Sequence, residues 1–217
     1  MQNYGGEIRR AKRARGVDRM KIIGITGGVG AGKSAILKFL EAEYGGRVIE
    51  ADLVGHLVME PGTAGYQAIL EQFGSEILDV DGRIDRKALG GIVFADPEKL
   101  QILNGIIHPA VKNWIRTEIE KEQAAGDRQL LIIEAALLIE DHYEELCEEF
   151  WYIYTEPEIR RARLKETRGY TDEKITAILG NQLSDEVFRT HCQKVINNNG
   201  SKEEAYSQIR ELMEKGE

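Results

Sequence analysis

A glycine-rich segment near the start of the sequence constrains this chain more than any other feature. Residues 27–34 read Gly-Gly-Val-Gly-Ala-Gly-Lys-Ser and fit the phosphate-binding pattern G-x-x-x-x-G-K-[ST]. The apolar run at 21–26 predicts a buried strand before the segment, and residues 35–40 predict a helix after it. Backbone amides at such a strand-to-helix turn bind polyphosphates. The segment therefore predicts a nucleotide site, with a ligand-free glycine-rich turn as the alternative.

Two side chains of this loop carry the expected chemistry. Lys33 is placed to reach the β- and γ-phosphates of a nucleotide, and the Ser34 hydroxyl to hold Mg²⁺. The glycines allow the backbone N–H groups to approach the phosphates closely. The motif by itself does not distinguish a kinase from a GTPase or a mechanical ATPase.

The rest of the sequence alternates between expected strands and expected helices. We expect strands at 47–52, 130–134, 150–154 and 194–197. Residues 63–125 are expected to be mostly helical, with short helices at 84–94 and 100–107 and a longer one starting near 108–109. A charged helical segment at 157–187, interrupted at Gly169, and an amphipathic helix at 201–215 follow. This alternation predicts an α/β fold with a parallel sheet flanked by helices on both faces.

Length and charge limit the possible partners. The chain has 217 residues, which fits one large domain or a core with inserted subdomains, and its net charge of −8 argues against a general nucleic-acid binder. Residues 1–19 carry six basic and two acidic residues and lack the apolar stretch of a secretion signal. We expect them to be a disordered extension, with a nucleic-acid or membrane-surface arm as the alternative. Neither nucleic acid nor a membrane is expected as a partner.

The two cysteines, Cys147 and Cys192, lie far apart in the sequence and form no C-x-x-C pair. They predict neither a disulfide framework nor a zinc site, and a reduced, cytoplasmic setting fits this usage.

Two acidic residues end expected strands. Asp52 follows the strand after the phosphate loop, and Glu134 ends the next one. Carboxyl ends of parallel strands border the ligand crevice, where Asp52 can accept a proton from an acceptor hydroxyl or bind metal-bound water. An N-cap for a helix starting at Leu53 is its alternative role. Glu134 can support the Mg²⁺ shell, or it is simply an acid at the rim of the sheet.

Arginines crowd one segment of the expected charged helix. Arg160, Arg161, Arg163 and Arg168 precede the break at Gly169, which is typical of a lid that closes over phosphates. A solvated charged helix is the alternative. No N-K-x-D motif for a guanine base is present, so a GTPase is disfavoured and a small kinase fits best.

Several motifs, in their order and spacing, carry a family resemblance. Besides the phosphate loop, these motifs are Glu50-Ala51-Asp52, Phe73-Gly74, Asp81-Gly82-Arg83-Ile84-Asp85-Arg86, Val93-Phe94, His108-Pro109, Leu137-Leu138-Ile139-Glu140, Gln182 and Ile196-Asn197-Asn198-Asn199-Gly200. With them, residues 20–212 resemble the dephospho-CoA kinase family.

The resemblance implies a P-loop kinase domain at 20–217 with a parallel five-stranded sheet. It implies a helical CoA-binding insertion at about 60–125 and an arginine-bearing lid at about 157–187. ATP would phosphorylate the ribose 3′-hydroxyl of dephospho-CoA, with Mg²⁺ as cofactor, in the last step of coenzyme A synthesis. Either a monomer or a weak homo-oligomer is compatible with it.

The resemblance also implies roles for single residues. The expected catalytic residues are Asp52 as general base, Lys33, Arg163 and Arg168. The expected nucleotide contacts are Gly28, Gly30, Ala31, Gly32, Lys33, Ser34, Ala35 and, at the adenine, Asn198; those to the acceptor are Asp52, Arg86 and His108; those to the metal are Ser34 and Glu134.

The chain departs from the family pattern at some of these positions. Glu50 replaces an aspartate, Ala35 replaces a serine or threonine, and Glu134 replaces an aspartate. In the lid, Arg168 is displaced by one position. Two other classes stay open: another small-molecule or nucleotide kinase with the same core, and a nucleotide-binding protein without catalysis.

Overall fold

The computed structural model describes residues 20–215, so the expectation for residues 1–19 lies outside the described residues. Five strands form one sheet: β1 (Lys21–Thr26), β2 (Arg47–Glu50), β3 (Leu130–Glu134), β4 (Glu149–Tyr154) and β5 (Lys194–Asn197). Their order is β2-β3-β1-β4-β5, and every neighbouring pair is parallel. The expected α/β fold is confirmed.

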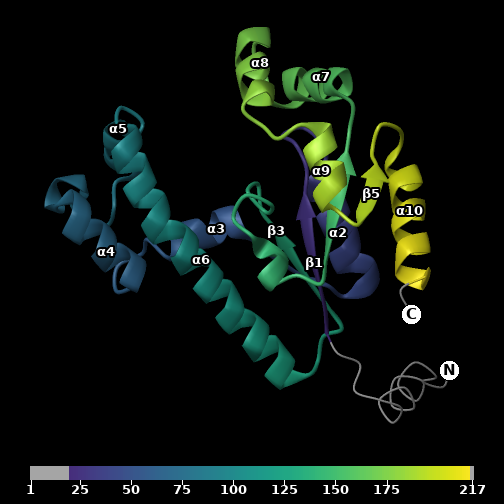
Figure 1. The fold of residues 1–217 in the computed structure, drawn as a ribbon, viewed down its shortest axis with the longest axis horizontal. Coiled ribbons are helices and arrows are strands. Elements are labelled where there is room, and N and C mark those ends of the chain that lie inside the picture. Colours follow the sequence, from purple (N-terminus) through teal and green to yellow (C-terminus); the bar gives the residue numbers. More distant parts are fainter. Residues whose placement is uncertain (1–19, 216–217) are drawn as a thin grey trace.

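One face of the sheet is covered by α2 (Lys33–Tyr44) and α10 (Lys202–Lys215) (Figure 1). Their buried residues Leu40 and Ile209 pack with Ile23 and Trp151 of the central strands. The sheet is apolar on both faces here, which is why β3 consists of a continuous apolar run rather than an alternating one.

The opposite face is covered by α3 (Ala51–Leu57), the second half of α6 (Pro97–Ala125) and α9 (Asp185–His191). Val54, Ile115 and Phe188, one from each helix, join the same buried cluster as Ile133 and Tyr152 of the sheet.

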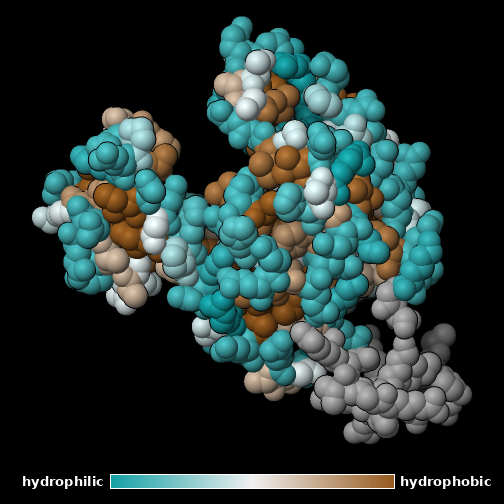
Figure 2. Space-filling view, in the orientation of Figure 1, coloured by the Kyte–Doolittle hydropathy of each residue, from teal (hydrophilic) through white to brown (hydrophobic). Residues whose placement is uncertain are grey.

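A separate helical group extends from this face. It contains α4 (Ala64–Phe73), the 3-10 turn Ser75–Ile77, α5 (Arg86–Val93) and the first half of α6, and it has its own buried cluster around Ile69, Ile77 and Leu89. We call residues 64–110 the helical lobe. α7 (Pro157–Arg168) and α8 (Asp172–Gly180) form a second projection, the α7–α8 hairpin. Figure 2 shows a hollow between these two projections, and the strands run toward it (Figure 1).

Two expected helices at 100–107 and from 108–109 are wrong as separate elements. α6 runs through Pro109 without interruption over 29 residues. Proline removes one helical N–H, here the partner of the Gly105 carbonyl, at some cost to the helix. Burial on both sides of it offsets the cost: Leu103 packs in the helical lobe, and Ile115 packs on the sheet.

Other boundaries differ by small steps. The strand expected at 47–52 ends at Glu50, because α3 begins at the buried Ala51. The segment 157–187 contains two helices and the start of a third, and the break at Gly169 is confirmed as the C-cap of α7 with φ of 60°. Within residues 20–215, no helix is long and apolar enough to cross a membrane.

Candidate active site

The phosphate loop connects β1 to α2 at the end of the sheet that faces the hollow. Gly32 is the N-cap of α2 with φ of 88° and ψ of 21°, a left-handed conformation that favours glycine. A Cβ there would also meet the amide nitrogen of Asn198. The conformation turns the chain so that α2 begins with free amides at its N-terminus, and those amides are the groups that bind phosphate.

Lys33 is anchored at the mouth of this loop. Its Nζ donates to the carbonyl oxygen of Gly27 at 2.7 Å and lies 3.4 Å from Oε1 of Glu134. Two oxygens thus hold the ammonium group beside the loop. From this position the side chain of Lys33 can exchange these partners for the oxygens of a bound phosphate. The role expected for Lys33 at the β- and γ-phosphates stays a prediction.

Glu134 is buried at the end of β3, with 9% of its surface exposed. Burial raises the pKa of its carboxyl group, and the neighbouring Lys33 opposes this shift. The charges of Asp52 and Glu50 act on this pKa in the same direction as burial. Lys33 is the group that opposes them, and its Nζ lies 3.4 Å from the carboxylate of Glu134.

Asp52 lies in the first turn of α3 and is exposed. The alternative in which it caps a helix starting at Leu53 is wrong, because the N-cap position belongs to Glu50 and the helix includes Ala51. The buried side chains of Ala51 and Val54 fix this earlier start. The carboxylate of Asp52 is therefore not engaged as a cap and remains accessible for acceptor chemistry.

The two residues expected to hold a divalent cation, Ser34 and Glu134, offer oxygens as ligands. Ser34 is exposed at the start of α2, and Glu134 lies beside Lys33. In the described part of the chain, no three side chains of His, Cys, Asp or Glu are grouped to hold an ion on their own. The oxygens of the two expected ligands suit Mg²⁺, which keeps waters and phosphate oxygens and takes one or two protein ligands.

The lid arginines differ in where they point. Arg163 is half-buried at the base of α7, where its guanidinium donates to the carbonyl oxygens of Ala31 at 3.4 Å and Asn198 at 2.9 Å. Arg168 is exposed at the end of α7, with its guanidinium 5.9 Å from the ring centre of Tyr170. The structure therefore brings Arg163, but not Arg168, to the phosphate loop.

A third arginine reaches the loop as well. The Nε of Arg160 donates to the carbonyl oxygen of Val29 at 2.9 Å, and its Nη2 donates to Oε1 of Gln182. Burial lowers the pKa of this guanidinium but does not discharge it, since arginine stays protonated in proteins. The sequence placed Arg160 among the lid arginines and Gln182 among the residues that carry the family resemblance, but it did not predict that the two would meet at the phosphate loop. The available signal was that Arg160 lies four residues before the buried Leu164, on the same helix face.

Asn198 is buried after β5, and its side chain donates to the carbonyl oxygen of Ala31 at 2.7 Å. The hydroxyl of Thr155 accompanies it, 3.0 Å from the same carbonyl. Asn198 thus joins the loop after β5 to the phosphate loop. Its expected contact with an adenine stays a prediction.

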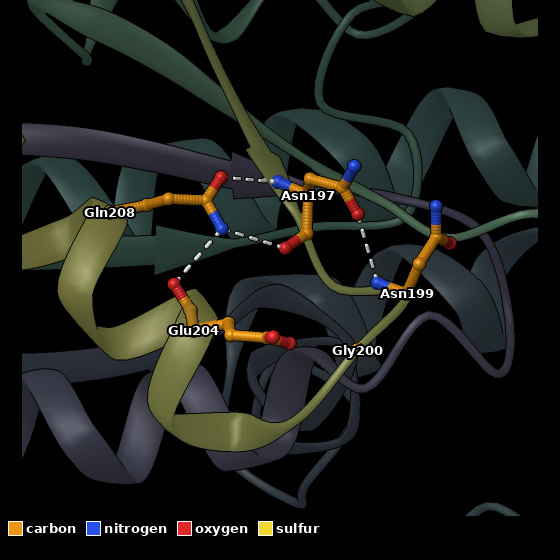
Figure 3. Close-up of a pocket in the computed structure, with 5 residues that line it drawn as sticks. All are labelled: Asn197, Asn199, Gly200, Glu204 and Gln208. Atoms are coloured by element: carbon orange, nitrogen blue, oxygen red, sulfur yellow. Dashed lines mark hydrogen bonds between the residues drawn. The ribbon is translucent and has the colours of Figure 1, made fainter.

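A cavity of about 440 Å³ borders the turn between β5 and α10, lined by Asn197, Asn199, Gly200, Glu204 and Gln208 (Figure 3). The Gln208 amide pairs with both backbone groups of Asn197, accepting from its N–H and donating to its carbonyl. These bonds occupy the free edge of the strand. Asn198 does not line this cavity.

The expected acceptor residues lie on two different elements. Arg86 is exposed in the first turn of α5. His108 lies in α6, with its Nδ1 2.9 Å from Oδ1 of Asp141 in the segment after β3. His108 thus joins α6 of the helical lobe to the segment that follows the site strand.

An apolar groove separates α6 from the end of α3 and from α4. Its volume is about 640 Å³, and its walls include Leu57, Ala68, Ile106 and Trp114. Leu53, which follows Asp52 in α3, and Leu57, which lines the groove, are both exposed. An elongated acceptor with an apolar arm can be held here.

Comparisons with known proteins agree with this geometry. The family model described as dephospho-CoA kinase matches residues 21–204. A dephospho-CoA kinase of Thermosynechococcus vestitus is 37% identical, covering 89% of this chain and 93% of the relative. One of Listeria monocytogenes is 36% identical, covering 90% of this chain and 96% of the relative.

Two solved structures share the fold. The protein TT1252 from Thermus thermophilus has a TM-score of 0.75 at 27% identity, covering 91% of this chain and 98% of that one. The dephospho-CoA kinase from Campylobacter jejuni has a TM-score of 0.67 at 24% identity, covering 90% and 98%. The second, at its lower identity, supports the fold alone.

Proposed function

This chain belongs to the dephospho-CoA kinase family, and on that premise we propose that it transfers the γ-phosphoryl group of ATP to the ribose 3′-hydroxyl of dephospho-CoA. The enzyme is a phosphotransferase with an alcohol group as acceptor, and its product is coenzyme A. The observation that carries the proposal is the anchoring of Lys33 between Gly27 and Glu134 in a complete phosphate loop.

Phosphoryl transfer depends mainly on positioning and on charge around the transferred group. The amides at the start of α2 hold the phosphates, and Lys33 moves from the Gly27 carbonyl to the β- and γ-phosphates. Arg163 fixes the loop against the segment after β5 through the Ala31 and Asn198 carbonyls. In this proposal, Arg168 approaches the phosphates only if the α7–α8 hairpin moves.

Asp52 receives the proton of the acceptor hydroxyl. Its exposed carboxylate stands at the start of α3, and its charge acts on Glu134, which pairs with Lys33. When Mg²⁺ is bound, it neutralises charge on the phosphate oxygens, and we propose Ser34 and Glu134 as the protein groups that hold it.

The acceptor extends from Asp52 toward the helical lobe. We propose that its apolar pantetheine arm lies in the groove beside Leu57 and Trp114 and that Arg86 and His108 position its polar parts. The helical lobe then acts as the CoA-binding insertion and the α7–α8 hairpin as the lid. A cytoplasmic setting without a nucleic-acid or membrane partner, which the net charge of −8 favours, belongs to the same proposal.

The test compares acceptors under one ATP–Mg²⁺ condition. kcat/KM is measured for dephospho-CoA, adenosine, AMP and shikimate. Dephospho-CoA is expected to be strongly preferred, because remote binding energy positions the reacting hydroxyl. A preference for one of the other three would favour a different small-molecule kinase, and ATP binding without transfer to any acceptor would favour a non-catalytic protein.

A further inference from the structure

Arg160 connects three parts of the chain that are far apart in sequence. It lies in the first turn of α7, one branch of its guanidinium contacts Val29 of the phosphate loop, and another contacts Gln182 in the connection between α8 and α9. Arg160 and Gln182 are 22 positions apart. Their contact therefore closes the α7–α8 hairpin at its base and joins both ends of the hairpin to the loop.

The guanidinium lies directly over Gly28. A Cβ on Gly28 would overlap its carbon and both terminal nitrogens, so this position of Arg160 requires a glycine in the loop. Lys33 binds the carbonyl of Gly27 and Arg160 binds that of Val29, so the two cations flank Gly28. Within residues 20–215, Nη1 of Arg160 makes no hydrogen bond to protein and is free to donate to a phosphate oxygen.

Gln182 determines which way this guanidinium faces. The hydrogen bond from Nε to Val29 alone leaves the planar group free to swing about that bond. A second bond, from Nη2 to Gln182, fixes the plane. The amide of Gln182 is neutral, so it orients the guanidinium of Arg160 and leaves its positive charge unpaired. A glutamate at this position would neutralise that charge.

We propose that Gln182 is a positioning residue of the phosphoryl-transfer site. It holds Arg160 over Gly28 and thereby couples the connection between α8 and α9 to the phosphate loop. The inference rests on the proposed function, because the transferred phosphoryl group is what an oriented cation at this place would stabilise. Motion of the α7–α8 hairpin that breaks the Arg160–Gln182 contact would then change the alignment of Arg160 at the loop.

The test uses Gln182→Met, which keeps the length of the side chain and removes the acceptor oxygen. kcat for dephospho-CoA phosphorylation is expected to fall about tenfold, within the range for small misplacements of a reacting group. KM for dephospho-CoA is expected to change less than twofold, and the melting temperature should stay constant. A drop in melting temperature with unchanged kcat would overturn the proposal and leave Gln182 as a hairpin brace only.

A double-mutant cycle tests whether Gln182 acts through Arg160. Arg160→Lys removes the fork, and adding Gln182→Met to it should then cost no more than twofold further in kcat. If the loss of kcat in the double variant equalled the product of the losses in the two single variants, the two residues would act independently, which would contradict the proposal. Arg161→Lys is the matched control: among residues 20–215, Arg161 bonds to Asp172 and Thr176 inside the hairpin and not to the phosphate loop, so this variant should keep wild-type kcat.

The same variants also separate this inference from the proposed function. If the wild-type enzyme does not phosphorylate dephospho-CoA, the proposed function fails, and the variants are compared in ATP hydrolysis without an acceptor. The tenfold loss for Gln182→Met is expected there too, because the phosphate loop is the same. Equal hydrolysis rates for wild type and Gln182→Met would overturn the positioning role.

Discussion

Single side chains at the phosphate loop have separable tasks. In the proposed function, Lys33 brings positive charge to the phosphates, and in this structure its ammonium group contacts the oxygens of Gly27 and Glu134. Lys33→Ala should fold normally and lose on the order of 10²-fold or more in kcat, as expected for removing a donor from a developing charge. Steady-state kinetics with a thermal melt check this. A variant that retains more than half the wild-type kcat would show that the loop is not catalytic.

Asp52 should matter for proton transfer rather than for nucleotide binding. Asp52→Asn preserves shape and the start of α3, but an amide cannot accept the proton, so kcat should fall by roughly 10²- to 10⁴-fold. ATP affinity, measured by calorimetry, should change less than about threefold, since Lys33 and the loop amides hold the phosphates. A collapse of ATP affinity would instead assign Asp52 to the metal.

At the scale of elements, an ionic cluster holds α6 to the edge of the sheet. Arg47 of β2 contacts both Glu118 and Glu122 at 2.6 Å, and Arg128 contacts Glu122 at 3.0 Å. Arg47→Met would leave two mostly buried carboxylates one helical turn apart without their shared partner. The free energy of unfolding should fall by about 1–3 kcal/mol. Arg83→Met, which breaks an exposed pair with Glu60, is the control and should cost under about 0.5 kcal/mol.

The same cluster predicts a pH dependence. Hydrogen bonds from Lys121 and Arg47 hold the pKa of Glu118 below its ordinary value of 4.5. A lowered pKa in the folded state contributes stability above that ordinary value, and the contribution is lost as pH falls through the folded-state pKa. The difference in unfolding free energy between wild type and Arg47→Met should therefore shrink as the pH falls below 4.5. A difference that grows on acidification would contradict the assignment.

The groove beside α6 should select for the acceptor arm. Ala68→Phe fills the groove from α4 and should raise KM for dephospho-CoA about tenfold, equivalent to about 1.4 kcal/mol of lost binding. Adenosine, which lacks the arm, should react as it does with the wild type. Gln67→Phe is the matched control, because Gln67 is exposed and is not a groove residue. If Ala68→Phe and Gln67→Phe changed KM for dephospho-CoA equally, the assignment of the acceptor arm to the groove would be wrong.

Sequence patterns predicted the elements with local signals better than the contacts between them. The phosphate loop and the buried run of β3 are local, and both expectations agree with the structure. The uninterrupted course of α6 through Pro109 is not local, because burial in two different clusters sustains it. Arg160 and Gln182 meet only after α7 and α8 have folded back, so no spacing rule brings them together.

At the scale of the whole molecule, the phosphate loop, the groove and the α7–α8 hairpin belong to different parts of the fold. The phosphate loop lies on the sheet, the groove lies between the sheet-bound α3 and the helical lobe, and the α7–α8 hairpin is tied to the loop by Arg160 and Arg163. In the proposed function, nucleotide and acceptor therefore bind to different parts of the chain and meet at Asp52. Each ligand should stabilise the fold through its own set of residues.

This division predicts two separable thermal shifts. ADP–Mg²⁺ and dephospho-CoA form no reactive pair, so each can be added to saturation without turnover. A ligand at about 100 times its Kd should raise the free energy of unfolding by about 2.7 kcal/mol, and the melting temperature by roughly 5–10 °C for a chain of 217 residues. Lys33→Ala should lose most of the ADP shift and keep the dephospho-CoA shift. Ala68→Phe should keep the ADP shift and lose about half of the dephospho-CoA shift, because tenfold weaker binding removes about 1.4 of the 2.7 kcal/mol. Loss of both shifts in either variant would mean that nucleotide and acceptor share one binding surface, and the assignment of the groove to the acceptor would fail.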